Sequence, residues 1–321
     1  MTDELKGKYA VQCLGEGRKM NRTMRKRMAI TYQQLYQKLS SVYGGGEAKA
    51  MIRLVMEVGF GYSFADVLSG GLEQMSEDDE NRLDELIDKL LKGEPVQYVL
   101  GQADFCGRTF RVAPGVLIPR PETEELCQWI ISDLVGSSTA PHSSSLSLSP
   151  SFPSPHVLDI GTGSGCIAVT LAKDIPYARV TAWDISEEAL LIARDNAEQL
   201  AAEVHFIKQN ALQAPLHQHC WDVIVSNPPY ICQKESRQMD KNVLEHEPHS
   251  ALFVPDNDPL LFYDAIVRYA QTALKEGGAM YFEINPLWIE ALQILLKKMG
   301  WESVIVRNDA FGKLRMVKVQ R

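Results

Sequence analysis

A short apolar run that passes directly into a glycine-rich turn constrains the fold of this chain more than any other feature. Residues 157–160 form the run, residues 161–165 read Gly-Thr-Gly-Ser-Gly, and a helical pattern begins at Cys166. Glycine permits backbone conformations and close approaches that a Cβ atom would block. Strand, glycine turn and helix in this order are typical of the ligand-binding edge of an open α/β sheet. The sequence therefore predicts an α/β domain with a ligand over this turn.

The chain beyond residue 155 supports a largely parallel sheet. Short β-like runs alternate with amphipathic segments, and this alternation is typical of parallel strands with crossover helices on both faces. The β-like runs are residues 156–160, 180–185, 204–209, 222–226 and 279–284, and the helical segments are 187–200, 259–274 and 287–299. Two last runs, 302–306 and 314–319, are joined by a loop too short for a crossover helix. We therefore expect the last strand to enter the sheet antiparallel.

A helical bundle and a linker are predicted before this domain. Apolar residues at three- and four-residue spacing predict a bundle over residues 29–93, with Ser76 as a helix N-cap and Gly93 as a left-handed helix end. Residues 94–121 contain two β-like runs, 96–100 and 109–112, and are expected to form a β-hairpin linker.

Two segments lack the residues that build a core. Residues 1–28 form a basic, polar extension, and residues 136–155 contain nine serines and four prolines. We expect a solvated extension and a surface loop, respectively. The loop interrupts a domain that is predicted to span residues 122–321 and to begin with a helix at 122–135.

The glycine turn and an acid downstream of it together indicate a nucleoside-containing cofactor. The dinucleotide fingerprint requires a third glycine where Cys166 stands, and no phosphate-loop lysine follows the turn. The spacing resembles the S-adenosylmethionine turn of class I methyltransferases. Asp184 stands 23 residues after Gly161, near the distance of about 20 expected for an acid that accepts from both ribose hydroxyls. A plain tight turn, and a helix cap at Asp184, are the alternatives.

The candidate cofactor residues extend beyond the turn and the acid. Asn210 follows the third predicted strand, where its side chain would accept from the adenine amine or would be an ordinary loop residue. The expected cofactor-binding residues are Gly161, Thr162, Gly163, Ser164, Gly165, Asp184, Asn210 and Asn227.

A second motif, Asn227-Pro228-Pro229-Tyr230, follows the buried run 222–226. Two prolines hold the chain extended and leave their carbonyls free to accept hydrogen bonds. The asparagine offers one acceptor and two donors for a planar NH2 group and its neighbouring oxygen or ring nitrogen, and the tyrosine offers an aromatic face. The loop therefore fits a weakly nucleophilic amide or nucleobase amine, whose alignment with the methyl group is what a protein can supply. We predict Asn227, Pro228 and Tyr230 as catalytic, and all four residues as substrate-binding.

The chain resembles a known family, the protein-glutamine methyltransferases that modify peptide-chain release factors. The resemblance covers residues 28–321 and is carried by the glycine turn, the Asn-Pro-Pro-Tyr-Ile loop and a specific linker signature. The remaining matching segments are Gly93-Glu94-Pro95 with Tyr98 and Gly101, Phe105-Cys106-Gly107 with Phe110, residues 116–124 (Val-Leu-Ile-Pro-Arg-Pro-Glu-Thr-Glu), His246-Glu247-Pro248, and Asp309 with Gly312 and Arg315. The chain departs from the family pattern in three places. Residues 283–288 read Glu-Ile-Asn-Pro-Leu-Trp where Glu-x-Gly-x-x-Gln is usual, which puts a substrate-side role there in doubt. The Ser/Pro-rich stretch is longer than usual, and the basic start before Met28 is an addition.

The resemblance implies a fold, a reaction and a partner. It implies a Rossmann-like class I methyltransferase domain with a seven-stranded sheet, preceded by a helical bundle. The architecture alone motivates the hypothesis that this bundle binds the release factor away from the glutamine. The resemblance also implies methyl transfer from S-adenosylmethionine to the side-chain amide of the glutamine in the Gly-Gly-Gln motif of class I release factors. The glycine turn and Asp184 would hold the cofactor, and residues 227–230 would hold the glutamine.

Composition narrows the alternatives. The formal net charge of −8 disfavours binding to nucleic acid across a broad surface, and no apolar run is long enough to span a bilayer. Six scattered cysteines and the absence of a leader-like start indicate the cytoplasm, without a disulfide framework. Histidines near Cys220 and around Pro248 are weak metal candidates, and we expect no metal and a monomer. An enzyme acting on adenine or guanine amines in DNA or RNA, and a non-catalytic adaptor for release factor or cofactor, remain as alternatives.

Overall fold

The computed structural model describes residues 31–136 and 154–321, which form two compact units divided between Leu91 and Lys92. The basic extension predicted for residues 1–28 and nearly all of the Ser/Pro-rich loop lie outside the described residues. None of the described helices is long and apolar enough to cross a membrane. Within residues 31–136 and 154–321, no cluster of three metal-ligating side chains is found.

The first unit is helical. Its elements are α2 (Tyr32–Ser40), α3 (Gly45–Phe60), α4 (Phe64–Leu68), η2 (Gly71–Gln74) and α5 (Glu77–Leu91). The apolar stripes that the spacing predicted are buried, with Leu35, Ile52 and Leu83 at 1% exposure or less. Ser76 accepts from the Asp79 amide at 3.1 Å and caps α5, as expected. Gly93, two residues beyond α5, has the left-handed φ of +87° that the sequence indicated.

The predicted strand at residues 96–100 is a helix, α6 (Val96–Leu100), so this expectation was wrong. Pro95 precedes the helix, and its carbonyl accepts from the amides of Tyr98 and Val99 at 2.9 and 3.0 Å. Gly101, with φ +75°, ends it. Five residues rich in valine and aromatic side chains give no decisive periodicity, and the proline and glycine at the two ends decide the outcome. A hairpin does follow, made of β1 (Gln102–Phe105) and β2 (Arg108–Arg111).

The second unit contains the predicted seven-stranded sheet. Its strands are β3 (His156–Ile160), β4 (Arg179–Asp184), β5 (Val204–Lys208), β6 (Trp221–Ser226), β9 (Leu274–Glu283), β10 (Ser303–Asn308) and β11 (Leu314–Gln320). Their order is β10-β11-β9-β6-β3-β4-β5. The pairs from β9 to β5 are all parallel, whereas β11 pairs antiparallel with both β9 and β10, which confirms the expectation for the last strand.

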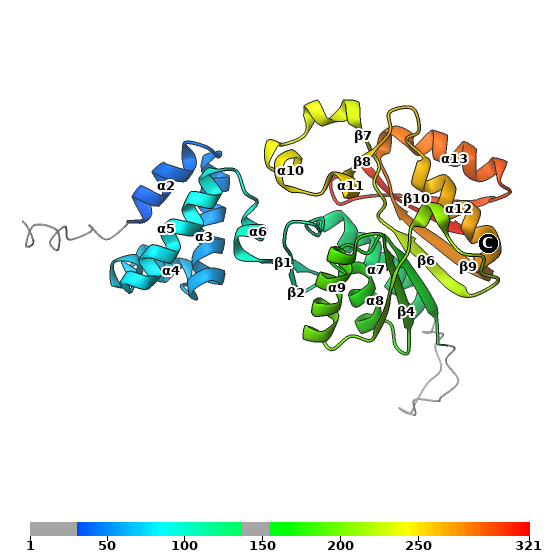
Figure 1. Ribbon diagram of the computed structural model, residues 1–321, viewed down its shortest axis with the longest axis horizontal. Coiled ribbons are helices and arrows are strands. Elements are labelled where there is room, and N and C mark those ends of the chain that lie inside the picture. The colour runs from blue at the N-terminus through cyan, green and yellow to red at the C-terminus, as the bar shows by residue number, and fades with distance from the viewer. Residues whose placement is uncertain (1–30, 137–153) are drawn as a thin grey trace, which may run out of the picture. The chain divides into compact units, whose positions relative to one another are not determined.

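Helices cover both faces of this sheet (Figure 1). On one face lie α7 (Pro121–Gly136), α8 (Cys166–Asp174) and α9 (Glu187–Gln199), and on the other lie α12 (Leu261–Ala273) and α13 (Ile289–Lys298). Successive strand residues point to opposite faces. Val157 and Val223 therefore belong to one apolar core, whereas Leu158 and Ile224 belong to the other.

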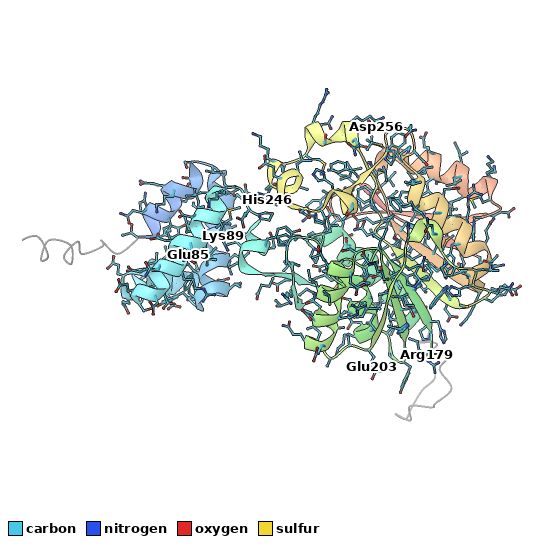
Figure 2. The ribbon with its side chains drawn as sticks, in the orientation of Figure 1. Glu85, Lys89, Arg179, Glu203, His246 and Asp256 are labelled. Atoms are coloured by element: carbon cyan, nitrogen blue, oxygen red, sulfur yellow. The ribbon has the colours of Figure 1, made fainter. Side chains whose placement is uncertain are left out.

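An insertion between β6 and α12 lies beyond the carboxyl end of the sheet. It consists of β7 (Ile231–Cys232), η4 (Gln233–Gln238), α10 (Lys241–His246), α11 (His249–Leu252) and β8 (Phe253–Val254). Figure 2 labels His246 and Asp256 on this segment, and labels Arg179 and Glu203 near the opposite, amino-terminal ends of the strands. In parallel sheets ligands bind at the carboxyl ends of the strands, so the insertion is placed to enclose a bound molecule.

Candidate active site

The glycine turn at the end of β3 forms one wall of a cavity of about 360 Å³. Gly161 and Gly163 line this cavity and have φ values of +78° and +55°, which favour glycine. Four of the five amides of the turn donate hydrogen bonds within the protein, that of Gly163 to Asp184. Those of Gly161 and Thr162 donate to the Trp183 carbonyl at 2.8 and 2.9 Å, and that of Gly165 donates to Thr162. The turn therefore lines the cavity through the shape of its backbone.

Thr162, Ser164 and Gly165 face the protein and do not line this cavity. Thr162 is 4% exposed and its hydroxyl donates to Asp159 at 2.6 Å. The carbonyl of the buried Ser164 accepts from the side-chain Nδ2 atom of Asn196 at 2.9 Å. A Cβ atom on Gly165 would stand 3.0 Å from the Cβ of Ala193 in α9, so the glycine permits close packing. These three residues hold the turn in position.

Asp184, at the end of β4, lies in the same cavity. Its two carboxylate oxygens accept from the amides of Gly163 and Ser186, each at 2.9 Å. Burial raises the pKa of Asp184, and those backbone donors oppose the rise. Asp184 therefore joins the glycine turn to the residue before α9. It is not the helix cap that was the alternative, because Ser186 is the N-cap of α9 and accepts from the Ala189 amide at 3.1 Å.

Asn210 also lines this cavity and is the N-cap of η3 (Ala211–Gln213). Its Oδ1 atom accepts from the Leu212 amide at 2.9 Å. The exposed apolar side chains of Ile185 and Leu212 line the cavity as well, which gives the region beside Asn210 an apolar surface suited to a flat ring.

Asn227 joins this first cavity to a second one of about 270 Å³. Pro228 and Pro229 line the first cavity, whereas Tyr230 lines the second. The second cavity also receives Arg120 from the chain before α7 and Glu283 from the end of β9. The structure therefore brings the two predicted motifs together, with Asn227 at their junction.

Glu283 organises the second cavity, although no role was predicted for it. It is 2% exposed, and its two carboxylate oxygens accept from the hydroxyls of Thr123 and Tyr230 at 2.6 and 2.9 Å. Burial raises the pKa of Glu283, and the two hydroxyl donors and Arg315 oppose the rise. Thr123 also accepts from Asn227 Nδ2 at 3.2 Å. The tyrosine thus contributes its hydroxyl to a buried network in addition to its ring.

Arg120 is held at the second cavity by Glu247 of the insertion. Glu247 is 4% exposed, accepts from the Ile118 amide at 3.2 Å, and pairs with the Arg120 guanidinium. A buried carboxylate with this partner fastens the chain before α7 to the insertion, and so fixes two walls of the cavity relative to each other.

Asn285, in the segment that departs from the family pattern, also supports the loop. Its Nδ2 atom donates to the Tyr230 carbonyl at 3.2 Å and to Glu235 at 3.0 Å, and its Oδ1 accepts from the Leu287 amide. An asparagine here therefore contributes contacts that a glycine cannot make.

One signal in the sequence pointed to Glu283, namely an acid as the last residue of a buried strand that ends at the ligand-binding edge.

Comparisons with known proteins agree with this geometry. Residues 143–250 match the family model of the methyltransferase small domain, and residues 31–101 match that of the PrmC N-terminal domain. The release factor glutamine methyltransferase of Bacteroides thetaiotaomicron is 43% identical over 286 residues, which are 89% of this chain and 97% of that protein. The protein of the same name from Flavobacterium psychrophilum is 38% identical over 89% of this chain and 96% of its own length.

A solved structure supports the fold. The hMettl16 catalytic domain, determined in complex with the MAT2A 3'UTR hairpin 6, has a TM-score of 0.50 at 16% identity and covers 70% of this chain and 79% of its own. At this identity the likeness concerns the fold only. The α/β sheet with an antiparallel last strand is that of the class I S-adenosylmethionine-dependent methyltransferases.

Proposed function

The chain belongs to the family of release factor glutamine methyltransferases, and we propose that it methylates the side-chain amide nitrogen of the glutamine in the Gly-Gly-Gln motif of class I release factors. It is an S-adenosylmethionine-dependent enzyme. The observation that carries the assignment to particular residues is the position of Asn227, which lines both the cavity of the glycine turn and the cavity of Tyr230 and Glu283.

The first cavity fits the cofactor. Gly161 and Gly163 leave space for a ligand against the turn, and the Asp184 carboxylate is suited to vicinal ribose hydroxyls. The apolar surface beside Asn210 is suited to adenine. S-adenosylmethionine supplies an electrophilic methyl group on a sulfonium sulfur. Of the eight residues predicted for the cofactor, Gly161, Gly163, Asp184, Asn210 and Asn227 line the cavity, whereas Thr162, Ser164 and Gly165 support it.

The second cavity fits the glutamine side chain. An amide nitrogen is a poor nucleophile because its lone pair is delocalised into the carbonyl. The protein can orient that nitrogen and accept hydrogen bonds from it as positive charge develops. Asn227 supplies an acceptor at the junction of the cavities, Pro228 and Pro229 fix the loop, and Tyr230 forms a wall. Arg120 adds a positive charge that can bind a peptide carbonyl of the substrate.

The helical unit over residues 31–91 is the proposed contact for the release factor outside the active site. Binding remote from the reacting group contributes to turnover when it positions that group. A short Gly-Gly-Gln peptide should therefore have a much lower kcat/KM than the intact factor, and equal values would refute this role. We place the reaction in the cytoplasm, where translation terminates, and expect a monomer by light scattering.

The experiment is methyl transfer from labelled S-adenosylmethionine to purified release factor. The matched control is the same factor with alanine in place of the glutamine of the Gly-Gly-Gln motif. We expect label on the first and none on the second. Transfer RNA, ribosomal RNA and DNA are offered under identical conditions, and preferential labelling of any of them would establish the nucleobase-amine alternative instead.

A further inference from the structure

A chain of hydrogen bonds runs from Glu283 through Thr123 to Asn227. Thr123 Oγ1 lies 2.6 Å from Glu283 Oε2, and Asn227 Nδ2 lies 3.2 Å from Thr123 Oγ1. The Tyr230 hydroxyl donates to the other carboxylate oxygen of Glu283 at 2.9 Å. The members come from α7, from the end of β9 and from the loop after β6, so their meeting is a product of the fold.

The chemistry of a hydroxyl group determines the donor-to-acceptor direction along this chain of hydrogen bonds. A carboxylate accepts hydrogen bonds and cannot donate them, and a threonine hydroxyl has a single hydrogen. Burial raises the pKa of Glu283, but each of its carboxylate oxygens accepts from a hydroxyl group, and these two donors and Arg315 oppose the rise. The hydrogen of Thr123 is therefore used on Glu283, and its oxygen can only accept from Asn227.

The direction of these hydrogen bonds determines which end of the Asn227 side-chain amide is available to a ligand. The NH2 group must turn toward Thr123, which leaves Oδ1 on the other side. No described residue donates a hydrogen bond to that Oδ1 atom, and Asn227 lines both cavities. A flipped amide would place NH2 where the glutamine NH2 must be received, and two donors would then face each other.

We propose that Thr123 and Glu283 are positioning residues that fix the orientation of the Asn227 amide, so that Oδ1 accepts from the glutamine nitrogen about to be methylated. This inference rests on the proposed function and extends it to two residues outside the Asn-Pro-Pro-Tyr loop. Neither residue needs to touch the reacting atoms, because both act through Asn227.

The kinetic test compares Thr123→Val, which preserves shape and removes the hydroxyl, with Thr123→Ser, which preserves the hydroxyl. Thr123→Val should lower kcat about tenfold, the size of one lost hydrogen bond, while the Kd for S-adenosylmethionine and the melting temperature stay near the parental values. Thr123→Ser should return kcat to within about threefold. Thr170→Val is the matched control, because the Thr170 hydroxyl is buried and has no partner in the described part of the chain; it should leave kcat unchanged.

A double-mutant cycle tests whether Thr123 acts through Asn227. In an Asn227→Ala background, Thr123→Val should have no further effect on kcat. Multiplicative losses, full activity of Thr123→Val, or failure of Thr123→Ser to recover would each overturn the proposal.

A spectroscopic readout separates this inference from the proposed function. The side-chain amide protons of Asn227 are assigned as the NMR pair missing from Asn227→Ala. One proton should be shifted and exchange slowly in the parental protein, lose both properties in Thr123→Val, and regain them in Thr123→Ser. An unchanged pair in Thr123→Val would overturn the hydrogen-bond chain, whatever the assay shows. If the parental protein leaves release factor unmethylated, the proposed function fails, and the spectra still decide the orientation of Asn227.

Discussion

The two turns at the ends of β3 and β6 present opposite sides of the chain to the ligand. At the glycine turn the backbone of Gly161 and Gly163 lines the cavity, whereas the side chains of Thr162 and Ser164 are buried in the protein. At the second turn the side chain of Asn227 lies at the cavities and is held by a distant network. The glycine turn therefore contacts its ligand through the shape of the backbone, whereas the second turn contacts its ligand through oriented polar groups.

The buried carboxyl groups beside these two turns differ in the hydrogen bonds that their oxygens accept. Both oxygens of Glu283 accept hydroxyl hydrogen bonds. Asp159 is fully buried, and its Oδ1 atom has no hydrogen-bond partner among the described residues. Burial raises the pKa of Asp159 to about 7, and the nearby charge of Asp184 adds to the rise. Ionisation of Asp159, in β3 beside the glycine turn, is therefore unfavourable, although Thr162 and the Ala168 amide oppose the rise in its pKa. Both oxygens of Glu283 at the second turn have hydroxyl partners.

The largest expected effect is on the pH dependence of stability, tested with Asp159→Asn. An acid with a raised pKa in the folded state destabilises that state once ionised, so stability is lost as the pH rises from about 4 to about 7. The variant should lack this loss and, at pH 8 without cofactor, gain on the order of a few kcal/mol at about 1.4 kcal/mol per pKa unit. Urea unfolding of both proteins across this range is the measurement. Parallel stability curves would show that Asp159 is uncharged or well solvated.

The next effect is on turnover, through the second turn. Asn227→Ala removes the acceptor for the substrate nitrogen, and the rate of methyl transfer should fall on the order of 10²-fold, as for loss of one preorganised polar contact. Asn227→Asp should also fail, because a carboxylate cannot donate to Thr123 or to the glutamine carbonyl. Single-turnover methylation of release factor measures both, and parental rates in the two variants would rule out an amide-binding role.

A comparable or smaller effect is expected on cofactor binding. Asp184→Ala removes hydrogen bonds to a charged group, and the affinity for S-adenosylmethionine should fall by roughly 1.5 to 3 kcal/mol. The lost contact with the Gly163 amide also loosens the turn. Calorimetric titration is the measurement, and an unchanged Kd would remove Asp184 from the cofactor site.

The smallest effect concerns the shape of the glycine turn. Gly165→Ala forces a left-handed conformation at φ +82° on a residue with a Cβ atom, at a cost of about 1 to 2 kcal/mol. Its Cβ also meets Ala193 at 3.0 Å. Gly312→Ala is the matched control, because it has φ +81° and no atom within 4 Å of the new Cβ. Unfolding by urea should show Gly165→Ala to be the less stable variant, and equal losses would mean that α9 yields without cost.

The sequence predicted the features whose signals are local. The glycine turn and the Asn-Pro-Pro-Tyr loop each follow a strand, and Asp184 ends one. The short connection before the last strand required that strand to be antiparallel. The helix at residues 96–100 was missed because five residues give no clear periodicity.

The network around Asn227 had no such local signal. Thr123 and Glu283 are 160 positions apart, and no pattern in either segment indicates that the two residues meet. Their hydrogen bond depends on the packing of α7 against β9, which places the start of the helix beside the end of the strand. The hydrogen-bond partners of the turn amides could not be predicted from the sequence either, because the Trp183 carbonyl, which accepts from two of them, lies on a neighbouring strand.

The central claim is that the glycine turn serves cofactor binding and the second turn serves methyl transfer. The most direct test of this division is to measure cofactor affinity and methyl-transfer rate for both Asn227→Ala and Asp184→Ala. Cofactor affinity is determined by calorimetry, and the methyl-transfer rate is determined in single turnovers at saturating S-adenosylmethionine. The division predicts that Asn227→Ala loses rate and keeps most of its affinity, whereas Asp184→Ala loses affinity and recovers most of its rate once saturated. If the two variants lose rate and affinity in equal proportion, the turns do not act separately and the account is contradicted.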